Sequence, residues 1–194
     1  HKYTNDLETS WVSNHNLDDL SSSPYKDYLL TPTNNIYGSR LAVVEELIDG
    51  MIGIVDEVGN GKIADPFGSS IETADTSKVE SQYSWNSLTD FSDNITGVLN
   101  VYRGEFENGA DLEGIIDLVS AADSELASRV DSEIVASITA IEAIAGAGSM
   151  PFREAISDAN GRTLIQAAIN ALGTLQSSLL NDVKPLLNSW NSVY

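Results

Sequence analysis

Apolar residues recur along most of the chain at alternating spacings of three and four positions, which is typical of amphipathic helices. The clearest run begins near Tyr37 and places six apolar side chains on one helix face: Leu41, Val44, Ile48, Met51, Val55 and Val58. Further stripes predict helices over 88–102, 126–144 and 164–186, with a brief one over 112–119. No segment alternates with period two, so strands are not expected. Four such helices bury their stripes in an up-and-down bundle, and the predicted fold class is all-α.

Glycine, proline and small polar residues predict where these helices begin and end. Gly59, followed by another glycine at position 61, is expected to end the first long helix in a left-handed conformation. Ser87 has the spacing of a helix N-cap, with Asp90 three positions later. Pro185 should bend the last helix or begin a new turn, because proline lacks the amide hydrogen.

The pattern divides the chain into three parts. Residues 1–20 are expected to form the tail of a helix whose beginning is missing. Residues 21–36, rich in Ser, Pro, Thr and Asn, are expected to form a linker. Residues 37–194 are expected to form the helical bundle, with a long connection over 59–86. Connections of that length inside a compact domain are commonly functional or mobile.

Composition narrows the classes of partner. The 29 acidic and 10 basic residues give a formal charge of -19, which repels phosphate backbones and anionic lipid headgroups. Nucleic acid is therefore not expected as a partner, and no apolar run is long enough for a transmembrane segment. Cysteine is absent, which excludes disulfides and thiolate chemistry. The chain begins with His1, as a processed or internal fragment would, so an upstream signal or lipid anchor would lie outside the sequence.

Few residues support a metal or catalytic site. His1 stands at the end of the chain and His15 lies in an Asn-rich polar stretch without a second ligand at helical spacing, so both are expected to be exposed. The common hydrolase and nucleotide-binding motifs are absent. Carboxylates that could bind a divalent ion are explained more simply as solvated helix faces; they are Asp56, Glu57, Asp90, Asp93 and Glu105. No catalytic residue and no metal ligand is assigned.

The most informative stretch runs from Val79 to Phe91. It places short polar side chains and two aromatic residues just before a helix start, where unpaired amides favour an anion or a carboxylate. Capping by Ser87 and sealing of the bundle end by Tyr83 and Trp85 would account for part of it, but capping requires neither Glu80 nor Ser84. The ligand-binding candidates are Glu80, Ser84, Asn86, Ser87 and Asp90.

Six pieces of the chain carry a family resemblance. They are Gly59-Asn60-Gly61-Lys62-Ile63-Ala64-Asp65-Pro66, the stretch from Val79 to Phe91, Asn94-Ile95, Asn100-Val101-Tyr102, Pro151-Phe152 and Asp182-Val183-Lys184-Pro185-Leu186. In this order they resemble the second half of imelysin-like proteins, where a helix ending in E-V-G-x-x-K-I precedes an E-S-x-x-S-x-N-S connection and a helix that closes near N-x-Y-x-G. The family's later P-F segment and D-V-x-P-x-L ending extend the resemblance over nearly the whole chain.

The resemblance implies an architecture and a cellular setting. Imelysin-like proteins contain two helical bundles, with a G-x-H-x-x-E motif in the first half that this chain lacks. By the resemblance this chain is the second bundle, residues 1–20 end the last helix of a missing N-terminal bundle, and the partner is the missing N-terminal half of the same protein. It also implies an extracytoplasmic protein of a Gram-negative bacterium, periplasmic or a lipoprotein of the outer membrane or cell surface, with iron or haem as the cofactor of the complete protein.

Three functions remain open on these grounds. The first is a non-catalytic binding component linked to iron or haem uptake, with Glu80, Ser84, Asn86 and Ser87 contributing polar groups to the site. The second is a metal-dependent peptidase completed by a segment that carries G-x-H-x-x-E. A hydrolytic metal site needs ligands and a base, and neither is evident in this sequence. The third is a structural surface module that binds no small ligand.

Overall fold

The computed structural model describes residues 2–16, 18, 22–105, 112–146 and 148–189. The chain consists of two compact units, residues 1–47 and residues 48–194. Helix α3 (Arg40–Asp56) runs through the boundary between them. None of the described helices is both long and apolar enough to cross a membrane.

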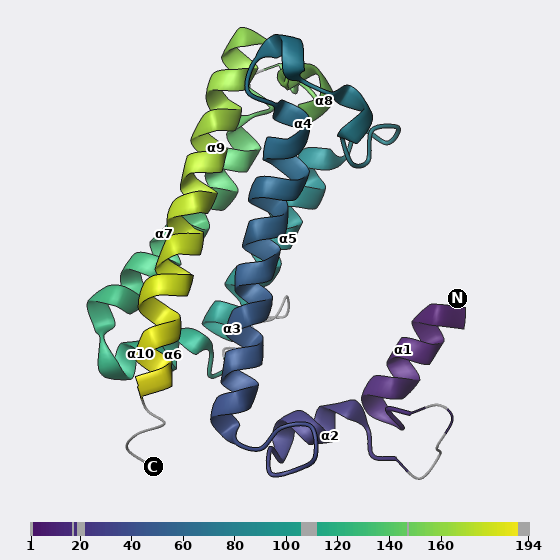
Figure 1. Cartoon of the computed structure of the whole chain (residues 1–194), viewed down its shortest axis with the longest axis vertical. Helices are drawn as coiled ribbons and strands as arrows, with labels where there is room; N and C mark the ends of the chain where they lie inside the picture. The colour runs from purple at the N-terminus through teal and green to yellow at the C-terminus, as the bar shows by residue number, and fades with distance from the viewer. Residues whose placement is uncertain (1, 17, 19–21, 106–111, 147, 190–194) are drawn as a thin grey trace. The chain divides into compact units, whose positions relative to one another are not determined.

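The second unit is a four-helix bundle. Its long helices are the end of α3, continued by a π-helix over Glu57–Ala64, then α5 (Ser87–Arg103), α7 (Ser124–Ala143) and α9 (Ala159–Ser178). Helix α7 contacts both α5 and α9, and α9 also contacts the π-helix. Successive long helices run in opposite directions (Figure 1). The predicted all-α, up-and-down bundle is confirmed.

Short elements join the long helices. The connection after the π-helix contains α4 (Asp65–Phe67) and two 3-10 turns, Ile71–Thr73 and Thr76–Lys78. Helix α6 (Ile115–Ala122) precedes α7, and α8 (Phe152–Ala155) precedes α9. A second π-helix, Leu179–Val183, leads from α9 into α10 (Lys184–Asn188). The described residues contain no β-strand.

The core of the bundle is made by the apolar stripes. In α3 and its π-helix, Ile48, Met51, Val55 and Val58 are buried, as the sequence predicts. The other long helices contribute further buried side chains: Phe91, Ile95, Val98 and Tyr102 from α5, Val130, Ile134 and Ile141 from α7, and Ile165, Leu172 and Leu175 from α9. Each fully buried side chain of this kind contributes about 1.5–3 kcal/mol to the stability of the fold. Burial of these stripes therefore holds the four helices together.

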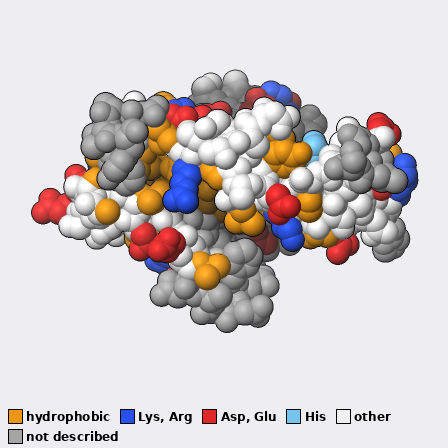
Figure 2. Space-filling model, turned by 90° about the horizontal axis from the view of Figure 1, so that it is seen from below, with side chains coloured by type: hydrophobic (Ala, Val, Ile, Leu, Met, Phe, Trp, Pro, Cys, Tyr) orange, Lys and Arg blue, Asp and Glu red, His pale blue; other side chains and the backbone are white. Residues whose placement is uncertain are grey.

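Charged residues join helices at the surface of the bundle. Arg103 on α5 donates through Nε and Nη2 to the two carboxylate oxygens of Asp131 on α7, over 2.6 and 2.8 Å. Lys184 of α10 pairs with Asp49 of α3. Figure 2 shows acidic and basic side chains beside hydrophobic ones on one face of the molecule. Two-point pairs such as Arg103 with Asp131 fix the orientation of both side chains as well as adding attraction.

Both π-helices precede a proline. The amide of Asp65 donates to the carbonyl of Asn60, and the amide of Lys184 donates to the carbonyl of Leu179, five residues back in each case. The next residues, Pro66 and Pro185, have no amide hydrogen and would interrupt the α-helical hydrogen bonds at this point. The widened π-helical turn changes the hydrogen-bond pattern just before each proline. The prediction that Pro185 begins a new turn is confirmed, since it stands at the start of α10.

The prediction that Gly59 ends the first long helix is wrong. The chain continues through Gly59 as a π-helix, and the residue is buried against α9. A Cβ placed on Gly59 would lie 3.4 Å from Cβ of Leu172, so this part of the π-helix packs directly against α9. Gly104, by contrast, does end α5 in the left-handed conformation that helix ends favour, with φ of 72°.

The first unit has its own small set of contacts. Helices α1 (Lys2–Val12) and α2 (Tyr25–Leu30) contact each other, with the rings of Trp11 and Tyr25 5.7 Å apart. The stretch predicted as a linker thus contains a six-residue helix, placed between the two prolines that exclude a longer one. His15 is half-buried and packs edge-on against Tyr28 at 4.8 Å, so the prediction that it is exposed is wrong. His1 lies outside the described residues.

Candidate functional site

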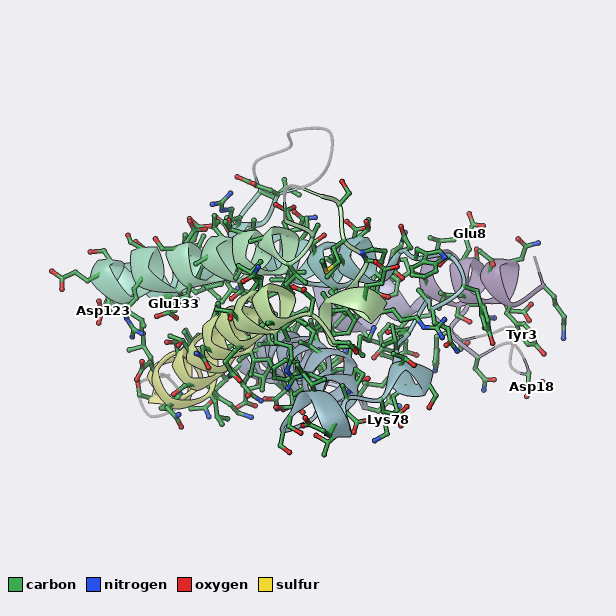
Figure 3. The ribbon with its side chains drawn as sticks, turned by 90° about the horizontal axis from the view of Figure 1, so that it is seen from above. Tyr3, Glu8, Asp18, Lys78, Asp123 and Glu133 are labelled. Atoms are coloured by element: carbon green, nitrogen blue, oxygen red, sulfur yellow. The ribbon has the colours of Figure 1, made fainter. Side chains whose placement is uncertain are left out.

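Arg162 of α9 fixes the beginning of the connection between the first π-helix and α5. Its Nη1 donates to the carbonyls of Phe67 and Ile156, both at 2.8 Å, and its Nη2 donates to the carbonyl of Gly68 at 3.2 Å. The guanidinium also stacks 3.8 Å above the ring of Phe67. Lys78, labelled in Figure 3, pairs with Asp65 at 2.6 Å within the same connection. These contacts hold an irregular backbone in one conformation.

The loop over 79–86 follows, and two of its residues adopt left-handed backbone conformations. Ser81 has φ of 56° and Trp85 has φ of 59°, and the amide of Trp85 donates to the carbonyl of Ser81 at 3.0 Å. Buried Val79 attaches the loop to the core. Tyr83 is 87% exposed and Trp85 is 52% exposed, so these rings do not seal the end of the bundle.

Ser87 is buried and connects α5 to the loop. Its hydroxyl donates to the carbonyl of Glu80 at a distance of 2.5 Å. The N-cap residue of α5 is Asn86, and no side chain caps the helix. The prediction that Ser87 is the N-cap is therefore wrong: Ser87 is the first residue of the helix, and its side chain bonds to the loop instead.

Asp90 accepts two hydrogen bonds from the loop. Asn86 donates from Nδ2 to Oδ1 at 2.6 Å, and Ser81 donates its hydroxyl to Oδ2 at 2.5 Å. The hydroxyl of Ser84 donates to the carbonyl of Ser81 at 3.2 Å. The carboxylate of Asp90, in the first turn of α5, is also favourably placed against the positive end of the helix dipole.

Lys62 joins this loop to the first π-helix. Its Nζ lies 3.1 Å from Oε2 of Glu80 and donates to Oδ1 of Asn94 at 3.0 Å. The Lys62 side chain is 20% exposed, against 50% for Glu80. Sequence reasoning did not assign Lys62 or Asn94 to the site, because their approach depends on the π-helix continuing past Gly59. Their presence in the segments shared with imelysin-like proteins was the signal that could have identified them.

All five predicted candidates therefore lie on one loop and helix start. We call the whole set the polar cluster: Lys62, Glu80, Ser81, Ser84, Asn86, Ser87, Asp90 and Asn94. Hydrogen bonds or an ion pair join Glu80 to Lys62 and Ser87, and Asp90 to Asn86 and Ser81. Ser84 contacts the backbone of the same loop. The cluster can offer ordered amide, hydroxyl, ammonium and carboxylate groups to a ligand.

The cluster is not arranged as an iron centre. Among the described residues, no group of three or more His, Cys, Asp or Glu side chains could hold a metal ion. Of the other carboxylates considered from the sequence, Asp56 accepts hydrogen bonds from Asn60 and Gln176, at 2.7 and 2.8 Å, and these bonds lower the pKa of Asp56. Glu105 pairs with Arg103. The side chains of the polar cluster thus suit hydrogen bonding to a ligand better than direct coordination of a metal ion.

Comparison with known proteins identifies a family. The family model described as Imelysin matches residues 2–179. The chain is 26% identical over 165 residues to iron-regulated protein A of Synechococcus elongatus. Among solved structures, it is similar to an imelysin peptidase from Bacteroides ovatus, with a TM-score of 0.84 and 28% identity over 98% of this chain. It is also similar to an iron-regulated protein A precursor from Parabacteroides distasonis, with a TM-score of 0.79 and 29% identity over 96% of this chain.

These matches correct the prediction about the partner. The family model begins at residue 2, and the solved relatives align with nearly the whole chain. The prediction that the partner is a missing N-terminal half of the same protein is therefore wrong, because the Imelysin family model matches residues 2–179 of this chain. The chain spans about half the length of its relatives, covering 44% of the Synechococcus protein and 52% and 53% of the two solved chains.

Proposed function

Because the chain belongs to the Imelysin family, we propose that it is an extracytoplasmic, non-catalytic binding component of an iron-uptake system and that it binds its ligand at the polar cluster. The link to iron is supported by the name of the Synechococcus relative, iron-regulated protein A. A location outside the cytoplasm is supported by the description of the Parabacteroides relative as a precursor. Attachment through a lipid anchor would be a further step of the same proposal.

One observation carries the proposal: ordered polar side chains and two exposed aromatic rings share a single loop. Glu80 and Asp90 are held by Lys62, Asn86 and Ser81, so the polar atoms of the cluster have fixed positions. Tyr83 and Trp85 stand in the same loop with more than half of their surface exposed. Such amphipathic rings beside fixed polar groups are common where proteins bind partly apolar ligands.

The chemistry of the cluster favours an iron complex with an organic ligand, such as haem, over a free iron ion. The described residues offer no group of three metal-binding side chains, so an ion would lack sufficient protein ligands. Carboxylate groups on the organic part could accept hydrogen bonds from the further N–H groups of Asn86 or Lys62, while Ser84 orders the loop through its bond to the Ser81 carbonyl. A flat ring system could pack against the exposed faces of Tyr83 or Trp85.

The test is a titration of the purified chain with haemin and, separately, with ferric citrate. We expect saturable binding of one of these complexes, followed by Trp fluorescence or by the haem absorption band. Glu80→Ala and Ser84→Ala should each weaken that binding by about tenfold, which corresponds to the loss of roughly one charge-assisted or ligand-ordering hydrogen bond.

Glu142→Ala is the matched control for Glu80→Ala. Glu142 is an exposed carboxylate on α7 outside the cluster, so its removal changes the net charge equally without altering the site. Equal binding by the parent and the two cluster variants would contradict the proposal. Equal weakening in the control would also contradict it, because the effect would not be specific to the polar cluster.

A peptidase is the second candidate, because one solved relative is described as an imelysin peptidase. Cleavage of a peptide that stops on addition of a chelator and resumes on addition of a metal would favour this function. A chain that shows neither ligand binding nor cleavage would instead favour a structural surface module.

A further inference from the structure

A cavity that is open to solvent lies at the opposite end of the bundle from the polar cluster. Its volume is about 460 Å³, and it lies between the start of α7 and the segment that runs from the second π-helix into α10. Figure 1 places the start of α5 near one end of the bundle and α10 near the other. The residues used below line this cavity: Asp123, Leu126, Arg129, Asp182, Pro185 and Leu186. This volume is in the range of small-molecule sites.

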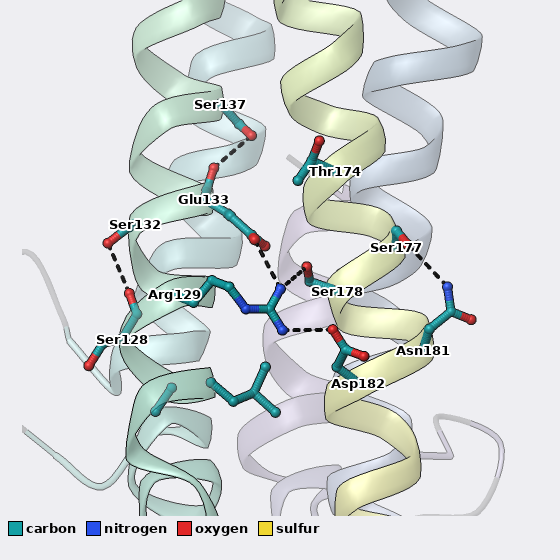
Figure 4. Close-up of polar contacts among 12 residues, drawn as sticks. Ser128, Arg129, Ser132, Glu133, Ser137, Thr174, Ser177, Ser178, Asn181 and Asp182 are labelled. Atoms are coloured by element: carbon teal, nitrogen blue, oxygen red, sulfur yellow. Dashed lines mark hydrogen bonds and ion pairs between the residues drawn. The ribbon is translucent and has the colours of Figure 1, made fainter.

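Arg129 stands in the wall of the cavity with part of its hydrogen-bonding capacity in use (Figure 4). Nη1 donates to Oε1 of Glu133 at 3.1 Å and to the hydroxyl of Ser178 at 2.7 Å. Nη2 donates to Oδ2 of Asp182 at 2.7 Å. No described residue accepts a hydrogen bond from Nε. The Nε side of a guanidinium presents two parallel N–H groups, which match the two oxygens of a carboxylate.

Glu133 also holds the guanidinium of Arg129, by accepting the hydrogen bond from Nη1 at its Oε1. One of its oxygens, Oε2, is buried and has no hydrogen-bond partner among the described residues. A buried carboxylate oxygen without a partner is costly, and the neighbouring positive charge compensates it in part. Hydrogen bonds to Asp182 and Glu133 raise the pKa of Arg129, so the guanidinium stays charged in the cavity wall. Arg129 is therefore held as a fixed cation.

The charges around the cavity have both signs. Asp182 is presented by the second π-helix, and Asp123 stands at the N-terminus of α7, where its Oδ1 accepts from the amides of Glu125 and Leu126. A simple anion would meet Arg129 but also both aspartates, in a chain of formal charge -19. A simple cation would be repelled by the guanidinium of Arg129. A ligand with one charge of each sign can pair with both sets.

We propose that this cavity binds a small zwitterion of the free amino acid class. Its carboxylate takes the Nε side of Arg129, its ammonium group lies against the carboxylates of Asp182 and Asp123, and an apolar side chain contacts Leu126, Pro185 and Leu186. The proposal goes beyond the binding function assigned to the polar cluster and does not depend on it, because no residue belongs to both sites.

The test uses the intact chain, with L-leucine as the probe and NMR observation of the Arg129 Nε–H signal. L-leucine is expected to shift this signal saturably. N-acetyl-L-leucine lacks the cation and L-leucinamide lacks the anion, so each should bind at least about tenfold more weakly through the loss of one charge-assisted interaction. No shift with L-leucine, or equal binding of all three compounds, would overturn the proposal.

Two variants locate the site. Leu186→Trp adds an indole to the cavity wall without removing an ion pair, and it should weaken leucine binding by about tenfold or more. Leu180→Trp is the matched control, because Leu180 is exposed on the second π-helix, just before α10, and does not line the cavity. Asp182→Asn should weaken the binding of L-leucine more than that of N-acetyl-L-leucine. Unchanged leucine affinity in Leu186→Trp would contradict the assignment.

Discussion

The middle of the bundle and the connection over 65–86 are held together by different forces. In the middle, fully buried aliphatic and aromatic side chains such as Ile95, Ile134 and Leu172 meet across four helices. In the connection, order comes from hydrogen bonds and ion pairs, as between Arg162 and the Phe67 carbonyl or between Lys62 and Glu80. Both regions are ordered, but only the first buries a large apolar surface.

This difference separates stability from binding. Burial of apolar surface is the dominant favourable contribution to folding, whereas exposed ion pairs contribute little. The polar cluster can therefore change without a large loss of stability, and its exposed groups remain available to a ligand. The three predictions that follow test this separation, beginning with the region where the largest loss is expected.

Ile134→Ala should cause the largest loss of stability. Ile134 is fully buried on α7, the helix that contacts both α5 and α9, and its truncation leaves a cavity in the core. We expect the free energy of unfolding to fall by about 2–5 kcal/mol, measured by urea denaturation. Val135→Ala is the control, because Val135 is the next residue on the same helix and is exposed. Similar losses in both variants would show that the middle of the bundle is not tightly packed.

Arg162→Ala should have an intermediate effect. It removes donors from the carbonyls of Phe67, Gly68 and Ile156 and removes the cation above the Phe67 ring. We expect a loss of about 2 kcal/mol, since partly buried acceptors lose a charged donor. Proteolysis within 65–78 should also become faster, because Arg162 fixes the start of the connection. Arg153→Ala on α8 is the control; matching proteolysis in the two variants would contradict this role.

Tyr102→Phe should have the smallest effect at neutral pH and a distinctive effect at high pH. Tyr102 is fully buried and donates to the carbonyl of Ala127 at 3.0 Å. Burial, together with the negative charges of Asp131 and Glu133, raises the pKa of Tyr102 far above its usual value. Because the folded state holds this proton more tightly, its stabilising effect is complete below about pH 10 and is lost as the pH rises further.

The variant should therefore lose about 1 kcal/mol at pH 7, through the missing hydrogen bond. Above pH 10 the stability of the parent should fall more steeply than that of the variant. The difference between the two slopes should be about 1.4 kcal/mol per pH unit, because one proton is involved. Urea denaturation at a series of pH values measures both quantities. Tyr83→Phe, at an exposed ring, is the control. Parallel curves for the parent and Tyr102→Phe would disprove the link between the Tyr102 hydroxyl and alkaline unfolding.

The fold was largely predictable because its helices follow one periodic pattern. The buried residues Ile48, Met51, Val55 and Val58 are four of the six predicted from the first stripe. The π-helices were not predicted, because three- and four-residue spacing does not distinguish a widened turn from an ordinary one. Pro66 and Pro185, each two residues after the end of a π-helix, were the available signals, and only Pro185 was predicted to change the course of a helix.

The candidate site was predictable only where it is local in sequence. Glu80, Ser84, Asn86, Ser87 and Asp90 were identified together because they lie in one short stretch before and within the start of α5. Lys62 and Asn94 were missed, since their meeting requires the π-helix and α5 to lie beside the loop. The hydroxyl of Ser87 could satisfy either a helix amide or a loop carbonyl, and sequence alone favoured the wrong partner.

The most direct test of the central claim is the melting temperature of the double variant Glu80→Ala, Ser84→Ala, measured on the same sample that is titrated with haemin and ferric citrate. We predict a melting temperature within about 2 °C of the parent, because little apolar surface is lost, together with weakened binding. A fall of more than about 5 °C with binding unchanged would contradict the account, since it would mean that the polar cluster serves the fold and not a ligand.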